Sequence, residues 1–322
     1  MKVLVTGGAG FIGSHVAEKL VSRGDQVVIV DSFDPFYDPK VKRRNIGELM
    51  QSASAELIEA DICDESRLDN LIGDSQIDAI IHLAARAGVR PSLERPSDYI
   101  RTNVEGTQSL LDIARRRRIR PFVFGSSSSV YGDTTPVPFS EIQPADEPIS
   151  PYAATKRAAE LLCRVHACLY GASILCLRLF TVYGPRQRPD LAIHKFARLM
   201  LAKEEIPVFG DGSTERDYTY VGDAVDGIVR ALDWCNASAA GAFEIVNIGE
   251  SATTSLAALV DLIARELEVT PKIRQLPAQP GDVQRTYADI TRAKEILGYD
   301  PRTTMEEGIH RFAEWLRAQP AS

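Results

Sequence analysis

Short apolar runs alternate with amphipathic segments through the first half of this chain. The apolar runs predict buried strands at residues 3–5, 26–31, 56–60, 79–83, 121–126 and 173–179. Helical spacing of apolar positions fills most of the intervals between them, beginning with residues 12–20. This alternation is typical of an α/β fold, in which helices cover both faces of a parallel sheet.

The second half of the chain has a different pattern. After Tyr183-Gly-Pro185 the sequence loosens into turns and short elements, as expected for a smaller lobe that closes over one edge of the sheet. Residues 244–248 predict one further strand, which is expected to return to the main sheet. We therefore expect a sheet domain over residues 1–180 with a returning segment near 220–250, and a C-terminal substrate-binding lobe over residues 181–322.

Bulk composition argues against several classes of partner. With 322 residues, 44% of them hydrophobic, the chain is long enough for one large core and a smaller second one. A net charge of −7 argues against a nucleic acid or an anionic membrane as the main partner. The five cysteines include no C-x-x-C pair, and on a helix Cys163 and Cys168 point in different directions, so no metal site is expected. Because no apolar run approaches the roughly 20 residues that span a bilayer and a strand begins at once, we expect a cytoplasmic protein without a signal peptide.

The most informative motif is the glycine-rich turn between the first strand and the first helix. Gly8, Gly10 and Gly13 match G-x-G-x-x-G, while Gly7, Gly10 and Gly13 match the variant G-x-x-G-x-x-G. Glycine is needed here because the turn is tight and the backbone has to approach a pyrophosphate closely. The N-terminus of the following helix offers unpaired N–H groups and the positive end of its dipole to that anion. The motif predicts a dinucleotide site on a Rossmann-type doubly wound parallel sheet.

Asp31 indicates which dinucleotide binds. It ends the second strand about 20 residues beyond the glycines, where a carboxylate accepts hydrogen bonds from the adenosine ribose and repels a 2′-phosphate. Ser32, Phe33 and Asp34 follow it, so no arginine stands directly behind it in the sequence. The expected cofactor is therefore NAD rather than NADP. The alternative is an unrelated strand–turn–helix in which Asp31 is merely solvated.

A tyrosine–lysine pair marks the candidate reaction centre. Ser150 is a suitable N-cap and Pro151 a suitable first helical residue, so a helix is expected to begin here. Tyr152 and Lys156 then lie four residues apart on one face of its first two turns. A phenol with a pKa of about 10 is a poor base at neutral pH, but a neighbouring ammonium and a positively charged nicotinamide stabilise the phenolate. On its own, this spacing is equally consistent with an exposed helix pair.

Four serines at residues 126–129 follow an apolar strand. Because doubly wound sheets bind ligands at the carboxyl ends of their strands, these hydroxyls are expected at the ligand-binding edge. A serine there can share a proton with a substrate hydroxyl and Tyr152. The four serines alone are equally well explained as a polar turn, but that explanation weakens once the glycine turn and the tyrosine–lysine pair occur in the same chain.

Together these residues resemble the extended short-chain dehydrogenase/reductase family, and specifically its nucleotide-sugar epimerases. The resemblance covers essentially the whole chain, including residues 6–13, 61–62, 82–85 and 216–218. It implies that Tyr152 is the acid/base, that Lys156 binds the nicotinamide ribose, and that Ser127 assists the proton transfer. It also implies a homodimer formed through helices near residues 98–117 and 151–169.

The resemblance also implies two sets of binding residues. Those implied around NAD are Gly7, Gly10, Phe11, Ile12, Gly13, Asp31, Ser32, Asp61, Ile62, Leu83, Ala84, Ala85, Arg86, Asn103, Tyr152, Lys156, Phe180 and Val182. Those implied around a UDP-sugar are Arg90, Ser128, Ser129, Thr181, Arg188, Lys195, Phe209, Arg216, Asp282 and Arg285.

Differences within that family favour one reaction. The 4,6-dehydratases carry an Asp-Glu pair where this chain has Ser128 and Ser129, and UDP-glucuronate decarboxylases typically place a glutamate in the same stretch. Residues 87–92 and 183–190 resemble the UDP-glucuronate 4-epimerase branch. Gln279 stands where UDP-galactose 4-epimerases usually carry an arginine, so Arg285 is expected to take over a diphosphate contact.

The resemblance thus implies interconversion of UDP-glucuronate and UDP-galacturonate. C4 is transiently oxidised with tightly held NAD, and hydride returns to the opposite face of a 4-keto sugar without loss of CO₂. Arg188 would meet the sugar carboxylate as a bidentate pair. The alternative is that Arg186 and Arg188 are solvated loop charges or phosphate contacts.

Three other activities stay open at this point. They are 4-epimerisation of a neutral UDP-hexose or its N-acetyl form, decarboxylation of UDP-glucuronate, and NAD sensing without catalysis. Retention of the tyrosine–lysine pair disfavours the last of these.

Overall fold

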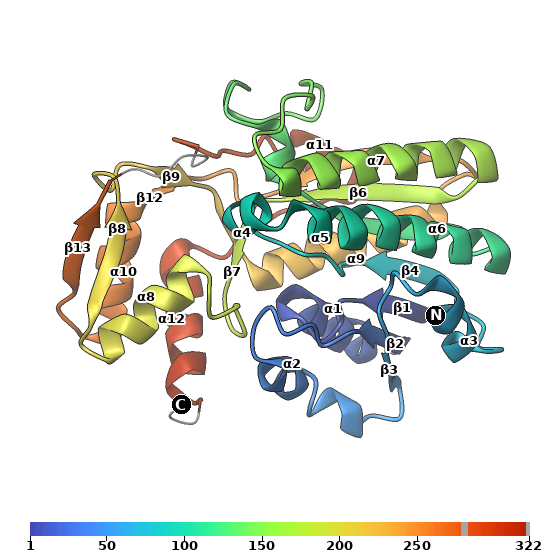
Figure 1. Cartoon of the computed structure of the whole chain (residues 1–322), viewed down its shortest axis with the longest axis horizontal. Coiled ribbons are helices and arrows are strands. Elements are labelled where there is room, and N and C mark those ends of the chain that lie inside the picture. Colours follow the sequence, from blue (N-terminus) through green and yellow to red (C-terminus); the bar gives the residue numbers. More distant parts are fainter. Residues whose placement is uncertain (278–282, 320–322) are drawn as a thin grey trace.

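The computed structural model describes residues 1–277 and 283–319, and its centre is a seven-stranded parallel sheet (Figure 1). The strands are β1 (Lys2–Thr6), β2 (Gln26–Asp31), β3 (Ala55–Glu59), β4 (Ala79–His82), β5 (Pro121–Ser127), β6 (Ser173–Leu179) and β11 (Phe243–Ile248). They lie in the order β11-β6-β5-β4-β1-β2-β3. The six strands expected in the first half are confirmed, and so is the strand that returns to the sheet after residue 180.

Two layers of helices cover the sheet, as the strand–helix alternation predicts. One layer contains α1 (Phe11–Ser22) and α9 (Val221–Ala237), and the other contains α3 (Glu65–Ile72), α6 (Gly106–Arg117) and α7 (Pro151–Tyr170). Successive residues of a strand point to opposite faces, so Val3 and Val5 join the first layer's core while Leu4 joins the second. Among the described residues, none of the helices combines the length and the apolar character needed to cross a bilayer.

The remaining helices are short or belong to the second half of the chain. They are α2 (Pro39–Asn45), α4 (Val89–Glu94), α5 (Pro96–Ile100), α8 (Ala192–Leu201), α10 (Leu256–Leu267), α11 (Thr291–Leu297) and α12 (Met305–Arg317). Short 3₁₀ helices occur at Leu49–Gln51 and Ser128–Tyr131, and a π-helical turn occurs at Arg101–Glu105.

A smaller lobe lies beyond the carboxyl ends of the strands (Figure 1). In the described part of this half, three two-stranded ladders occur: β7 (Thr181–Tyr183) with β10 (Tyr218–Tyr220), β8 (Glu205–Phe209) with β13 (Lys272–Leu276), and β9 (Glu215–Arg216) with β12 (Thr254–Ser255). Helix α10 packs against both α8 and α12 in this lobe.

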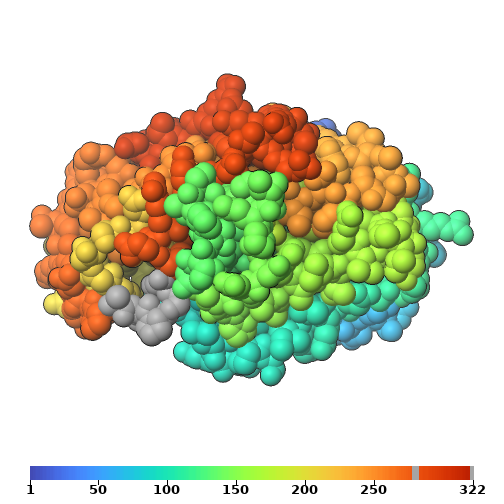
Figure 2. All heavy atoms as spheres, turned by 90° about the horizontal axis from the view of Figure 1, so that it is seen from above, coloured from blue at the N-terminus to red at the C-terminus, as the bar shows by residue number. Residues whose placement is uncertain are grey.

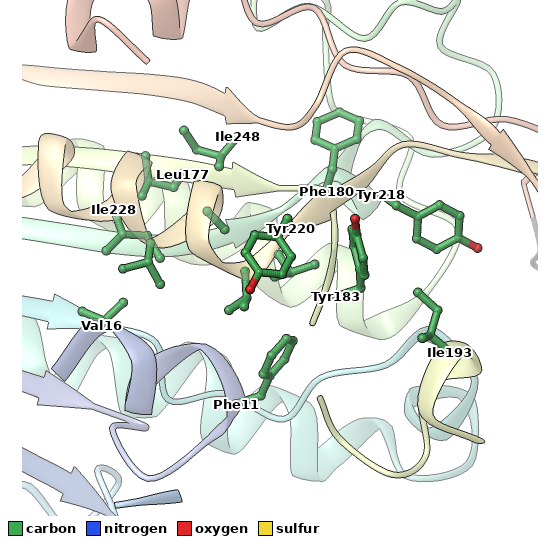
Figure 3. Packing of buried hydrophobic residues seen from close by; sticks show 14 of the residues in the cluster. Phe11, Val16, Leu177, Phe180, Tyr183, Ile193, Tyr218, Tyr220, Ile228 and Ile248 are labelled. Atoms are coloured by element: carbon green, nitrogen blue, oxygen red, sulfur yellow. The ribbon is translucent and has the colours of Figure 1, made fainter. Parts of the chain in front are cut away.

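One hydrophobic cluster joins the lobe to the sheet (Figure 3). Phe11 of α1 lies on one side of it, Ile193 of α8 on another, and Tyr183 of β7 lies between them. The rings of Tyr183 and Tyr220 meet edge to face, with centroids 5.9 Å apart. Because the two halves share this core, the lobe packs directly against the sheet domain at the carboxyl ends of the strands.

A long loop joins the turn at Ser128–Tyr131 to α7. Seen from above, it forms the green surface between the C-terminal segment and α7 (Figure 2). Phe139 in this loop forms a bridge with Ala288, and the Tyr131 hydroxyl donates to Asn247 Oδ1 at 2.8 Å. The bridge ties the loop to the segment before α11, and the hydrogen bond links the turn after β5 to the returning strand β11.

Candidate active site

A cavity of about 580 Å³ opens at the carboxyl ends of the central strands. Strands β1 and β4 are neighbours, but β2 and β3 continue the sheet beyond β1 whereas β5 and β6 continue it beyond β4. Doubly wound sheets bind their ligands at such a reversal of strand order. The volume is within the range of a few hundred to a thousand Å³ that is typical of small-molecule sites.

The glycine-rich turn forms one wall of the cavity. Gly7 has a φ of +68°, and a Cβ on it would lie 2.7 Å from the Ala84 nitrogen. A Cβ on Gly13 would lie only 2.2 Å from the Gly7 carbonyl oxygen, so both positions require glycine. Helix α1 begins at Phe11 without a side-chain cap, so its first-turn N–H groups remain for an anion in the cavity. This geometry fits the pyrophosphate of a dinucleotide.

The expected acid at the end of β2 lies in the same cavity. Asp31 is 5% exposed, accepts the Phe33 N–H at 2.8 Å, and pairs with Lys42 Nζ at 3.2 Å. Lys42 of α2 lines the cavity together with Phe36 and Tyr37, and these three residues were missed by sequence reasoning. A buried acid needs a partner, so a lysine on the next short helix was the signal that sequence reasoning overlooked.

Most of the expected NAD residues line the cavity. Besides the residues already described, they are Gly10, Ile12, Ser32, Asp61, Ile62, Leu83, Ala84, Ala85, Arg86, Phe180 and Val182.

Asn103 lies behind this wall instead of lining it. It is 1% exposed, accepts the Arg86 N–H at 2.8 Å, and donates to the Arg86 carbonyl at 3.0 Å and to Thr155 Oγ1 at 3.0 Å. It therefore fixes the segment after β4 from behind, a supporting position that sequence reasoning did not distinguish from a contact.

The tyrosine–lysine pair and the serines meet at the other end of the cavity. Ser150 caps α7 by accepting the Ala153 N–H at 3.2 Å, and Tyr152, Lys156 and Ser127 all line the cavity. The Lys156 ammonium donates to the Gly125 carbonyl at 2.7 Å, at the end of β5. The groups expected to move a proton are thus brought together by a helix start and a strand end.

Burial changes the proton affinities of these groups. It raises the pKa of Tyr152, while the Ser127 hydrogen bond and the Arg188 charge oppose that rise. Burial also lowers the pKa of Lys156 to about 8. The Lys156 ammonium uses one of its three N–H donors for the Gly125 carbonyl, and Ser127 and Arg188 are the groups that favour the Tyr152 phenolate in this structure.

A buried ion pair lies directly beneath the reaction end. Glu160 of α7 and Arg178 of β6 have side chains that are 0% and 2% exposed, and Arg178 donates from Nε at 3.0 Å and from Nη2 at 2.9 Å. Ser126, next to Ser127, donates to the same carboxylate at 2.6 Å. Sequence reasoning missed this pair, although residue 160 follows Lys156 by four positions on the same helix face.

The loop after β7 contributes Arg188 to the cavity. Arg188 lines it together with Thr181, Ser128 and Ser129 and is 15% exposed, so it is not a solvated loop charge. Arg186 has a different position: it pairs with Glu18 of α1 at 2.6 Å and anchors the loop.

The other expected substrate residues that the structure describes do not line this cavity. Arg90 lies over the Phe209 ring at 5.1 Å, Arg285 pairs with Glu215 at 2.8 Å, and Arg216 donates to the Glu215 carbonyl at 2.9 Å. Lys195 is exposed on α8. Asp282 and Gln279 lie outside the described residues. Within the described ranges, no group of three His, Cys, Asp or Glu side chains is arranged to hold a metal ion.

Comparison with known proteins agrees with this geometry. Residues 3–249 match the model of the NAD dependent epimerase/dehydratase family. The chain is 40% identical to UDP-glucuronate 4-epimerase 3 of Arabidopsis thaliana, covering 97% of this chain and 76% of that protein. UDP-glucuronic acid 4-epimerase from Bacillus cereus, solved with UDP-glucuronic acid and NAD, superposes with a TM-score of 0.91 at 35% identity and covers 98% of this chain and 99% of that one. UDP-glucose 4-epimerase from Thermotoga maritima, solved with UDP-glucose, gives 0.89 at 33% identity with the same coverage. The chain belongs to the NAD dependent epimerase/dehydratase family, and NAD is its cofactor.

Proposed function

We propose that this protein interconverts UDP-glucuronate and UDP-galacturonate by inverting C4 of the sugar. The observation that carries the proposal is the position of Arg188, which shares one cavity with Tyr152 and the serines at residues 127–129. An arginine fork is the side chain that best matches a carboxylate. Relatives that are UDP-glucuronate 4-epimerases add support.

The residues divide the chemistry between them. Bound NAD supplies the hydride acceptor for C4 and the donor that restores it. Tyr152 takes the proton of the sugar 4-hydroxyl and later returns it, with Ser127 sharing the hydrogen bond. Lys156, held at the Gly125 carbonyl, keeps a positive charge beside the cofactor. We propose the remaining cavity-lining residues as the walls that orient the dinucleotide and sugar.

The sugar carboxylate creates a specific hazard. A 4-keto sugar with a carboxylate at C6 is a β-keto acid. Its C5–C6 bond can break so that CO₂ leaves, the electron pair stays on C5, and a proton adds there. The bond breaks most easily when it aligns with the carbonyl π system. Arg188, with Ser128 and Ser129 as further donors, would hold the carboxylate away from that alignment.

Removal of Arg188 tests this role. We expect Arg188→Ala to lose most of its conversion of UDP-glucuronate, about 100-fold in kcat/KM, and to release a larger share of UDP-pentose, because the carboxylate has no partner to fix it. Product analysis by NMR measures both effects. Arg302→Ala is the control, since Arg302 is 83% exposed and pairs with Asp300 on the surface. Wild-type conversion by Arg188→Ala with unchanged KM would contradict the assignment.

A neutral UDP-hexose is the second candidate substrate. Asp190 pairs with Arg188 at 2.6 Å, so a sugar without a carboxylate would not leave a buried cation unpaired. A parallel assay with UDP-glucose and UDP-N-acetylglucosamine decides between them: faster turnover of either one than of UDP-glucuronate would favour the neutral substrate.

We further propose a cytoplasmic homodimer built of two-lobed subunits, with the lobes divided near residue 180. Leu161, Val165 and Leu169 follow each other at four-residue spacing on α7 and are 52, 52 and 64% exposed, and Ile100 nearby in the fold is 51% exposed. Such a stripe is typical of a surface covered by another chain. We expect the wild type to sediment as a dimer and Val165→Asp as a monomer. A monomeric wild type would contradict the proposal.

A further inference from the structure

The Asp190 carboxylate, two residues after Arg188, binds one edge of the Arg188 guanidinium. Arg188 Nε and Nη2 donate to the two oxygens of Asp190 at 3.0 and 2.6 Å. Arg188 lines the cavity, whereas Asp190 does not line it and is 41% exposed. The arginine therefore reaches the site while its partner lies outside the cavity wall.

Two further sets of contacts fix this arginine. The Arg188 Cζ atom lies 5.0 Å from the centre of the Phe36 ring, which comes from the loop after β2. The loop backbone is anchored where Arg186 pairs with Glu18 and where His15 Nε2 contacts the Pro185 carbonyl oxygen at 2.9 Å. The direction of the guanidinium is thus set by the protein before any ligand binds.

The second edge of the Arg188 guanidinium has no protein partner among the described residues. A guanidinium can bind one carboxylate through Nε and Nη2 and a second through Nη1 and Nη2. Asp190 takes the first edge. Within residues 1–277 and 283–319 no hydrogen-bond acceptor is bound to Nη1, although Arg188 is a lining residue of the cavity. One edge is therefore left for a carboxylate in the cavity.

We propose that Asp190 is a positioning residue that aims the free edge of Arg188 at the carboxylate of a nucleotide-linked uronate sugar. The inference rests on the proposed function and adds a residue that does not touch the substrate. Because Asp190 neutralises Arg188, the pair selects and orients the carboxylate by geometry rather than by an unpaired charge. Removal of the Asp190 carboxylate should therefore change kcat and the product composition more than it changes the affinity for the substrate.

Asp190→Asn is the sharpest test, because it is nearly isosteric and removes only the charge and one acceptor. We expect kcat with UDP-glucuronate to fall about 10- to 100-fold, since the fork is no longer fixed. We expect the UDP-pentose share of the product to rise, with KM within a few-fold of wild type and binding of UDP-glucose unchanged. NMR product analysis, steady-state kinetics and calorimetry measure these quantities.

The chain offers a matched control in Asp300→Asn. Asp300 also lies two residues from an arginine and accepts from Arg302 Nε at 2.9 Å, but on the surface. We expect this variant to match the wild type in kcat and in product composition. Thermal melting of both variants reports whether either has lost the fold.

The outcomes separate the role of Asp190 from the proposed function. Wild-type kcat and products from Asp190→Asn would reject the role of Asp190. Tighter binding of UDP-glucuronate with unchanged kcat would also reject it, because Asp190 would then merely occupy the edge that the substrate needs. Absence of UDP-glucuronate turnover by the wild type itself would reject the proposed function instead.

Discussion

Tyr152→Phe should bind NAD and UDP-glucuronate but lose turnover by about 10²- to 10⁴-fold, the range that acid–base catalysis typically contributes. The change removes one oxygen and keeps the ring, which packs edge to face against Tyr99 with centroids 6.2 Å apart. No histidine or glutamate is among the described lining residues, and the Lys156 ammonium is already bound to the Gly125 carbonyl. The lining aspartates, Asp31, Asp34, Asp61 and Asp98, are each paired with a lysine or an arginine, so Tyr152 is the group we expect to take the proton.

Kinetics and binding measured together make this prediction specific. Isothermal titration should give an affinity for UDP-glucuronate close to that of the wild type, while kcat falls. Tyr170→Phe is the matched control, because Tyr170 lies on the same helix but is 50% exposed. A Tyr152→Phe variant with more than a tenth of the wild-type kcat would mean that the acid/base has been misassigned.

Loss of the buried Glu160 carboxylate should destabilise the fold more than any other charge removal described here. We expect Glu160→Ala to lower the free energy of unfolding by about 3–5 kcal/mol, because it leaves Arg178 as a buried charge without its partner. Ser126 would also lose the acceptor it now has at 2.6 Å. Since domains are stable by only about 5–15 kcal/mol, the variant should unfold at a much lower urea concentration.

A milder variant and a surface control keep this prediction measurable. Glu160→Gln retains the shape and an acceptor, so it should lose less than Glu160→Ala yet remain clearly destabilised. Glu56→Ala removes a pair with Lys2 in which Glu56 is 60% exposed, and should cost under about 1 kcal/mol. Equal urea midpoints for Glu160→Ala and Glu56→Ala would show that the buried pair does not stabilise the fold as described.

The sheet and the glycine-rich turn could be predicted because residues close together in the sequence determine them. Buried parallel strands such as 26–31 consist of apolar residues on both faces, and Gly7 and Gly13 are required by backbone contacts within a few residues or at the neighbouring strand. The start of α7 likewise follows from Ser150 and Pro151, which act only on their own helix.

Contacts between distant segments could not be predicted in the same way. Nothing local distinguishes Asn103, which supports Arg86 from behind, from an asparagine that touches the cofactor. The partnership of Glu160 with Arg178 depends on how α7 packs against β6, and that of Lys42 with Asp31 depends on the course of the loop between them. Arg186 and Arg188 belong to one short loop, so the sequence could not show that Arg186 pairs with Glu18 whereas Arg188 lines the cavity.

The central claim is inversion at C4 by transient oxidation and return of the same hydride, with the carboxylate retained. Incubation of the purified protein with NAD and UDP-glucuronate carrying deuterium at C4, followed by NMR, tests it most directly. The account predicts UDP-galacturonate that keeps its deuterium at C4, with no release of CO₂. UDP-pentose, deuterium lost to water, or an unchanged substrate would contradict it.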